Sequence, residues 1–176
     1  MDSFFVHGEA DQVYPIDVVE TREVTPRLAK TLVDIDMQTF SECTLTMHSA
    51  MVFLQHGRVF LLRASGVVIG TAVCMRCWKH PQDVAIVAMG VKPGWRGRRL
   101  GLRFLEEISQ KLATSRVAGV RLMIDESNRR AVKLYRETGF FEIGRTESSE
   151  HGGASILVLR RVLRGNVTHL LRSSNQ

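Results

Sequence analysis

The sequence predicts an α/β fold, and two observations lead to that prediction. Segments in which apolar residues recur every three or four positions alternate along the chain with short runs of β-branched and other apolar residues. The chain has 176 residues, 44% of them hydrophobic, which is enough to bury one core and is a usual size for one domain. No repeat, low-complexity tract or linker divides it. We therefore expect a single domain over residues 1–176.

The N-terminal part predicts one extended segment followed by two helices. Residues 16–19 form the extended segment, and Pro26 suits the first turn of a helix because its fixed φ angle fits there. Apolar residues recur at intervals of three or four in both helices. They are Leu28, Leu32 and Ile35 in the first and Met47, Met51 and Leu54 in the second. Gly57 then ends the second helix.

The middle of the chain predicts three strands. Residues 58–64 and 67–78 are apolar, β-branched runs joined by Ser65 and Gly66, which is typical of a hairpin. Residues 83–91 form a third strand of similar composition.

A glycine-rich turn at residues 93–101 leads into a helix and a short strand. One face of this helix carries Phe104, Leu105, Ile108 and Leu112. The strand at residues 120–124 follows, and Ser127 can then cap a further helix at residues 128–138.

Two closing strands complete the prediction. Gly139 ends the last helix, and the runs at residues 140–145 and 154–160 flank a turn-rich segment at residues 147–153. The predicted order is therefore βααβββαβαββ.

The charge balance indicates an anionic ligand. Lys and Arg number 24 and Asp and Glu 18, so the net charge of +6 favours nucleic acid, acidic lipid or a phosphorylated cofactor. No apolar run approaches the roughly 20 residues that cross a bilayer. The first residues include Asp2, Glu9 and Asp11 and lack the basic start and apolar stretch of a secretory signal. We expect a cytoplasmic protein with no membrane partner.

The cysteines favour a structural role. Cys43, Cys74 and Cys77 are too few for a disulfide framework, and reduced thiols fit the cytoplasm. Cys74 and Cys77, with His80 nearby, could form a metal or redox site. Within a strand, however, their spacing turns the side chains to opposite faces, and no second pair of ligands follows. We therefore favour core packing and expect no metal.

The turn at residues 91–102 is the segment with the clearest chemistry. Its glycines let the backbone curl around a phosphate, and the amides at the start of the following helix are unpaired donors at the positive end of the helix dipole. Arg96, Arg98, Arg99 and Arg103 add charge that suits a pyrophosphate and a phosphate monoester. The pattern is neither a Walker loop nor G-x-G-x-x-G, and a simple connection is the alternative.

A second pattern identifies a family resemblance. Residues 128–140 read N-x-x-A-x-x-L-Y-x-x-x-G-F, and the earlier turn reads Val91-x-Pro93-x-x-Arg96-Gly97-x-x-x-Gly101. In this order and combination the two patterns resemble the GNAT superfamily of N-acetyltransferases, over about residues 16–161. The resemblance implies a mixed central sheet that is splayed at its centre and flanked by helices.

The resemblance also implies acetyl-CoA as cosubstrate, held between the strand that ends at Val91 and the strand that ends near Ile124. Its pantetheine arm would bond the backbone of Met89 and Val91, and backbone amides of the turn would hold the pyrophosphate. The residues implied to bind it are Met89, Val91, Arg96, Gly97, Arg98, Arg99, Leu100, Gly101, Leu102, Asn128 and Tyr135.

Arg99 departs from the family's turn. The family usually reads Q/R-x-x-G-x-G/A, and Arg99 stands where the first of those glycines is found. An arginine prefers a negative φ angle. We expect its backbone amide still to serve the cofactor, with its guanidinium turned to solvent or to the 3′-phosphate.

Tyr135 is the candidate catalytic residue. It corresponds to a tyrosine that in many family members protonates the departing CoA thiolate, and a phenol with a pKa of about 10 suits that donation. The alternative role of Tyr135 is core packing, with its hydroxyl donating a hydrogen bond to a backbone carbonyl. Asn128 can equally cap its helix or contact the cofactor.

No general base is assigned from the sequence. Many relatives use a carboxylate on the central strand, but Val87, Ala88 and Met89 offer none. Residues that could relay a proton through water, each more often a solvated surface residue, are Glu42, His48, Asp83, Glu147, Glu150 and His151.

The leading prediction is an N-acetyltransferase in which an amine attacks acetyl-CoA directly in a ternary complex, without a covalent intermediate on the enzyme. A ping-pong mechanism through a cysteine is a minor option. A non-catalytic CoA-binding regulatory module is the alternative. Nucleic-acid binding is disfavoured because no aromatic stacking platform lies among the basic residues.

No sequence motif identifies the amine acceptor, which can be a small molecule, a peptide or a protein. The layout also resembles the ribosomal-protein N-terminal acetyltransferases, but their tyrosine-rich closing segment is replaced by residues 146–150, Thr-Glu-Ser-Ser-Glu. The last strands could support a homodimer. We expect the basic tail at residues 164–176 to be partly disordered.

Overall fold

The computed structural model describes residues 4–7, 13–40, 45–148 and 154–163. Their contacts group into two compact units. The first comprises Met1–Met75 and Val87–Phe104, and the second comprises Arg76–Ile86 and Leu105–Gln176. The tail at residues 164–176, for which the sequence predicts partial disorder, lies outside the described residues. The expectation of a single domain stays a prediction.

The described elements follow the expected order after one additional strand at the N-terminus. They are β1 (Phe4–His7), β2 (Val13–Thr21), α1 (Pro26–Thr39), α2 (Met47–His56), β3 (Arg58–Ala64), β4 (Val67–Arg76), β5 (Asp83–Val91), η2 (Pro93–Trp95), α3 (Leu100–Ala113), β6 (Gly119–Asp125), α4 (Arg129–Glu137), β7 (Phe141–Ser148) and β8 (Ala154–Val162). The strands are hydrogen-bonded in the order β1-β2-β3-β4-β5-β6-β8-β7. The mixed α/β fold with a splayed sheet and flanking helices is therefore confirmed.

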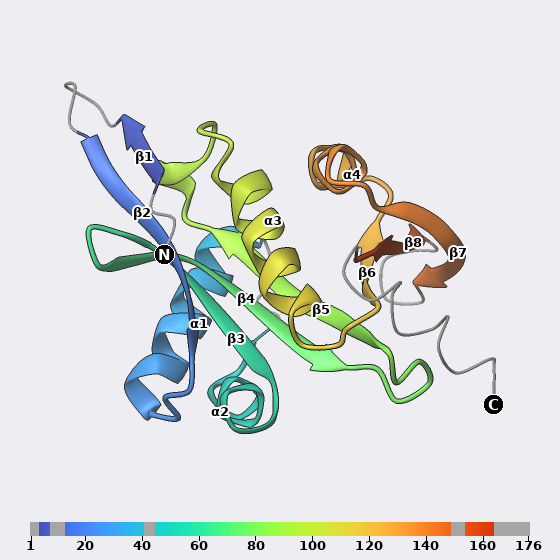
Figure 1. Ribbon diagram of the computed structural model, residues 1–176, viewed down its shortest axis with the longest axis horizontal. Coiled ribbons are helices and arrows are strands. Elements are labelled where there is room, and N and C mark those ends of the chain that lie inside the picture. The colour runs from blue at the N-terminus through green and yellow to red at the C-terminus, as the bar shows by residue number, and fades with distance from the viewer. Residues whose placement is uncertain (1–3, 8–12, 41–44, 149–153, 164–176) are drawn as a thin grey trace. The chain divides into compact units, whose positions relative to one another are not determined.

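The first unit is an antiparallel meander against which two helices pack (Figure 1). Thr25 caps α1, with Pro26 in its first turn, and Thr46 and Ser49 form a capping box at α2. The apolar faces of both helices meet β3 and β4 in one core, whose largest buried members include Leu28, Leu32, Leu54, Leu61 and Val73. This core holds α1 beside the strands that precede the glycine-rich turn.

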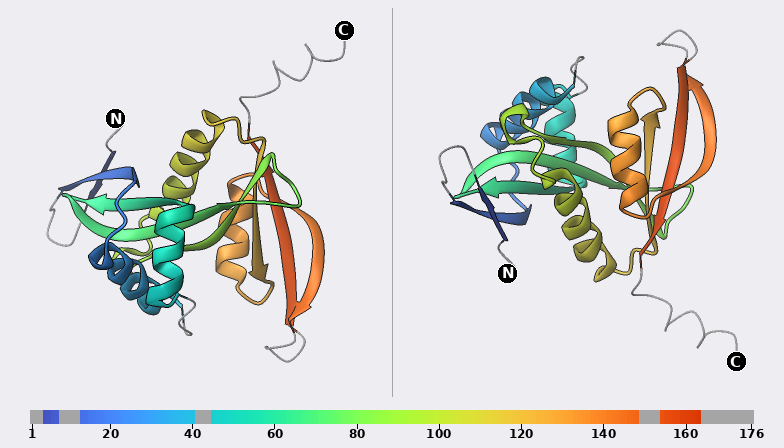
Figure 2. Two further views of the ribbon diagram at one scale, coloured as in Figure 1. Left: turned by 90° about the horizontal axis from the view of Figure 1, so that it is seen from below. Right: turned by 90° about the horizontal axis from the view of Figure 1, so that it is seen from above.

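The second unit is built around β6, β8 and β7. β5 pairs with β6 in parallel over only three positions, Asp83 to Ala85 against Gly119 to Arg121. β6 and β8, and then β8 and β7, pair in antiparallel fashion, and α4 covers one face of these strands (Figure 2). The short parallel ladder is the expected splay of the sheet at its centre.

Several predicted boundaries need correction. β4 ends at Arg76, so Cys77 follows the strand instead of lying within it. β7 extends beyond residue 145 because its pairing with β8 continues through polar residues as far as the pair Ser148 and Ala154. β8 extends to Val162, where it pairs with Gly119 of β6. The side chain of Asn128, not Ser127, caps α4 by accepting a hydrogen bond from the amide of Ala131 at 3.2 Å.

Candidate active site

The C-terminal half of β5 delivers the chain into the glycine-rich turn. Gly90 is buried, and Met89 and Val91 are half-buried. The amide of Lys92 donates to the carbonyl of Ile69 at 2.8 Å, so the pairing with β4 reaches the first residue after β5. The two residues predicted to bond the pantetheine arm therefore lie on a strand whose end is fixed. Their role stays a prediction.

The backbone of the turn presents a row of unused donors. The first hydrogen bond into α3 runs from the amide of Arg103 to the carbonyl of Arg99, at 3.2 Å. Among the described residues, the amides of residues 97–102 donate no hydrogen bond. Unpaired amides at the start of a helix attract an anion because they combine free donors with the positive end of the dipole. The turn therefore fits the pyrophosphate that the sequence predicts here.

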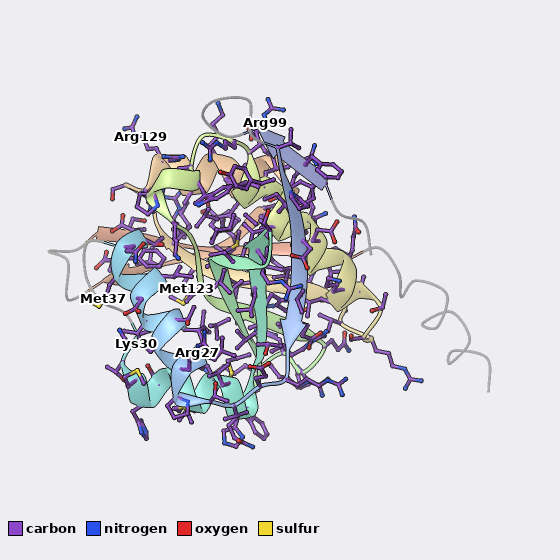
Figure 3. The ribbon with its side chains drawn as sticks, turned by 90° about the vertical axis from the view of Figure 1, so that its left-hand side faces the viewer. Arg27, Lys30, Met37, Arg99, Met123 and Arg129 are labelled. Atoms are coloured by element: carbon purple, nitrogen blue, oxygen red, sulfur yellow. The ribbon has the colours of Figure 1, made fainter. Side chains whose placement is uncertain are left out.

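Two residues of the turn adopt left-handed backbone conformations. Gly97 has a φ of 85° and Arg99 a φ of 55°. Arg99 thus adopts the conformation that the family's usual glycine favours, at the steric cost that a β-carbon brings. Its side chain is exposed and projects outward from the turn in Figure 3. The substitution therefore leaves the turn's shape in place.

This geometry leads to a prediction for Arg99→Gly. Because glycine removes the steric cost of positive φ, we expect the free energy of unfolding to rise by up to about 1 kcal/mol. Acetyl-CoA affinity should be similar or better by calorimetric titration. Arg99→Ala is the control, since it removes the charge but keeps the β-carbon. A complete loss of binding in Arg99→Gly would contradict our view of the turn.

Two guanidinium groups of the turn, those of Arg96 and Arg98, donate hydrogen bonds to backbone carbonyls. Arg96 donates through Nε to the carbonyl of Val91 at 3.2 Å and through Nη2 to the carbonyl of Thr39 at 3.0 Å. Arg98 donates to the carbonyl of Gly94 at 3.3 Å. The sequence predicts that both side chains contact phosphate, and that role stays a prediction. The backbone amides of residues 97–102 and the exposed Arg99 guanidinium make no hydrogen bond among the described residues.

Aromatic residues from the N-terminal strands support the turn. Tyr14 of β2 meets the Trp95 ring edge-on, with centroids 5.1 Å apart, and the Arg98 guanidinium lies 5.3 Å from the centroid of that ring. Arg103 lies over the ring of Phe4, 4.7 Å from its centroid. Sequence reasoning missed this support because nothing in the local pattern of residues 4–14 relates it to the turn.

In the second unit, α4 carries Asn128 and Tyr135. Asn128 caps the helix, as noted above, which is one of the two roles the sequence left open. Tyr135 is half-buried, and its ring lies 5.5 Å from that of Phe140. Burial raises the pKa of Tyr135 to about 12. Among the described residues its hydroxyl makes no hydrogen bond, and its role as the acid stays a prediction.

Asp83 is not the solvated residue that the sequence suggested. Its carboxylate is buried and accepts hydrogen bonds from Arg160, at 2.8 and 2.9 Å, and from Arg121, at 2.7 Å. The hydrogen bond from Arg160, reinforced by Arg121, lowers the pKa of Asp83. A carboxylate held in this way is a structural anchor and a poor proton acceptor.

Of the remaining base candidates, the structure describes two, and both are exposed. His48 on α2 and Glu147 on β7 are exposed. Glu42, Glu150 and His151 lie outside the described residues, as does Cys43.

An open groove of about 850 Å³ along α4 is lined by Asp125, Glu126, Ser127, Arg129, Val132, Lys133, Arg136, Glu137 and Ser155. None of the predicted site residues lines this groove.

The environment of Cys74 argues against a thiol mechanism. Cys74 is buried in β4, and burial raises its pKa to about 12. Because the thiolate is the nucleophile, we expect Cys74 to resist alkylation by iodoacetamide at pH 8 in the folded protein and to react after denaturation. Mass spectrometry of the labelled peptides measures this. Rapid labelling of native Cys74 would reopen the ping-pong option.

Comparison with known proteins decides the family. Residues 25–140 match the Acetyltransferase (GNAT) family. The chain belongs to this family. This GNAT chain is 31% identical over 108 residues to the N-alpha-acetyltransferase RimI of Mycobacterium tuberculosis. That match covers 60% of this chain and 66% of the relative, just under two thirds of its length.

Solved structures agree with the fold of this GNAT chain. The ribosomal-protein-S18-alanine N-acetyltransferase of Escherichia coli superimposes with a TM-score of 0.71 at 18% identity, covering 84% of this chain and 94% of that one. An acetyltransferase of Bacillus subtilis in complex with CoA gives 0.67 at 16% identity, covering 84% and 99%. None of the described helices of the GNAT chain has the length and apolar character of a membrane span.

Proposed function

We propose that this GNAT N-acetyltransferase moves an acetyl group from acetyl-CoA to a primary amine by direct attack in a ternary complex. The observation that carries the proposal is the row of unbonded backbone amides at residues 97–102, at the start of α3. Such a row fits the pyrophosphate of CoA. The structural neighbour from Bacillus subtilis that was solved with CoA supports this choice of ligand.

The predicted residues divide the work of binding and chemistry. The amides of Gly97 to Leu102 would hold the pyrophosphate, and the backbone of Met89 and Val91 would hold the pantetheine arm. The amine nitrogen forms a bond to the thioester carbon and loses a proton to water, while the bond from that carbon to sulfur breaks and CoA leaves as its thiolate. Tyr135 is protonated at neutral pH, as an ordinary phenol also is, and would donate to the departing thiolate; burial raises its pKa to about 12, which makes it a weaker acid than an exposed tyrosine.

For the acceptor, we propose the N-terminal amine of a polypeptide as the first class to test. The 31% identity to an N-alpha-acetyltransferase supports it. The segment at residues 146–150, which lacks the tyrosines of the ribosomal-protein enzymes, weighs against it. A cytoplasmic location and a homodimer through the last strands stay predictions.

The experiment that tests the function pairs calorimetric titration of acetyl-CoA with an assay of thiol release. The acceptors are a peptide with a free N-terminal alanine, the same peptide with an acetylated N-terminus and an internal lysine, and an aminoglycoside. Binding with thiol release supports the transferase and identifies the acceptor class. Binding without release from any acceptor favours the non-catalytic CoA-binding module, and no binding would overturn the proposal.

A further inference from the structure

The C-terminal end of α1 receives a cation from another part of the chain. The last carbonyls of a helix have no partner within the helix and form the negative end of its dipole, where a basic side chain is favourable. The last turn of α1 contains no basic residue. Its cation comes from the glycine-rich turn instead, because Nη2 of Arg96 donates to the carbonyl of Thr39 at 3.0 Å.

The same guanidinium also holds the end of β5. Nε of Arg96 donates to the carbonyl of Val91 at 3.2 Å. One planar group therefore joins the last residue of β5 to the last residue of α1. Arginine suits this position because its donors point in fixed directions from one rigid plane, whereas lysine presents a single ammonium group.

Packing brings the backbone of Gly90 in β5 close to the side chain of Thr39 in α1. A β-carbon placed on Gly90 would lie 2.6 Å from Oγ1 and 2.8 Å from Cγ2 of Thr39, so only glycine allows this approach. Oγ1 of Thr39 is buried and has no hydrogen-bond partner among the described residues. Thr31 in the same helix differs, because its hydroxyl bonds the carbonyl of Arg27. The hydrogen bond between Thr39 and the turn is therefore the one that the Arg96 guanidinium donates to the backbone carbonyl of Thr39.

We propose that Arg96 is a positioning residue that ties the end of α1 to the turn, so that acetyl-CoA bound at the turn stabilises the last turn of α1. This inference rests on the proposed function. Acetyl-CoA bound to the turn amides would immobilise the backbone around Arg96. This lowers the entropy cost of keeping the hydrogen bond from Arg96 to the carbonyl of Thr39.

Hydrogen exchange tests this coupling without knowledge of the acceptor. The readout is the amide of Phe40, which bonds the carbonyl of Asp36 at 2.9 Å, with and without saturating acetyl-CoA. We expect acetyl-CoA to slow its exchange about 10-fold in the wild type and less than about twofold in Arg96→Ala, since a hydrogen bond to a charged group is lost. Arg96→Lys should not restore the protection.

Arg98→Ala is the matched control, because it removes the same charge from the turn while the Arg98 guanidinium contacts only Gly94 and Trp95 among the described residues. This variant should keep the protection of Phe40. Calorimetry should give Arg96→Ala an acetyl-CoA affinity within about threefold of Arg98→Ala, because Arg96 acts on α1 and not on phosphate.

Two results would overturn the proposal. One is equal protection of Phe40 in Arg96→Ala and the wild type. The other is a large, salt-dependent loss of acetyl-CoA affinity in Arg96→Ala alone, which would make Arg96 a phosphate ligand. A wild-type protein that binds no acetyl-CoA would instead overturn the proposed function, whereas binding without protection at α1 removes only the coupling.

Discussion

Asp83→Asn should lower the free energy of unfolding by about 3 kcal/mol or more. The carboxylate of Asp83 is buried and bridges Arg121 and Arg160, so its removal leaves two partly buried guanidinium groups without their counter-charge. A β-carbon on Gly119 would lie 2.7 Å from Nη2 of Arg160 and 2.8 Å from Oδ1 of Asp83, so the bridge is packed directly against the backbone of β6. Urea unfolding measures the change.

The same bridge predicts an acid dependence of stability. Hydrogen bonds, first from Arg160, lower the pKa of Asp83 in the folded state below its unfolded value of about 3.9. Its stabilisation is therefore present above about pH 4 and is lost as the pH falls through the folded pKa. The acid limb of the stability curve should be shallower in Asp83→Asn than in the wild type.

Asp34→Asn is the matched control for this prediction. Asp34 also pairs with a basic residue, Lys30, at 2.9 Å, but both side chains are largely exposed. Exposed pairs of this kind contribute at most about 0.5 kcal/mol. Equal losses in Asp83→Asn and Asp34→Asn would show that burial of the Asp83 bridge does not matter.

Tyr135→Phe should reduce turnover by about 100-fold. The substitution removes the proton that we propose is donated to the thiolate, and general acid catalysis commonly contributes at least that much. Affinity for acetyl-CoA should change little, because the ring and its contact with Phe140 remain. Thiol release at saturating acetyl-CoA measures the effect.

Stability provides the control for Tyr135→Phe. Among the described residues the hydroxyl of Tyr135 makes no hydrogen bond, so its loss should leave the melting temperature unchanged or slightly higher. Full turnover in the variant would remove Tyr135 from the chemistry. A variant that is slow and also unstable would point to packing.

Much of the fold was predictable because it follows from local periodicity. The helices that begin at Pro26 and Met47, and the strand from Asp83 to Val91, lie where apolar spacing places them. β1 was missed because its four residues, Phe4–His7, are too few to show a period. The capping residue of α4 was misplaced by one position, because Ser127 and Asn128 are both good capping residues and only the backbone path selects between them.

For the candidate site, the sequence by itself determined the family, the glycine-rich turn and the position of Tyr135, because those depend on residue types at fixed short spacings. Only the tertiary structure decided that Arg99 takes a left-handed conformation, that Arg96 reaches Thr39, and that Asp83 is buried between two arginines. These contacts join residues far apart along the chain. Local spacing carries no signal for them, since long-range packing alone brings such residues within hydrogen-bonding distance.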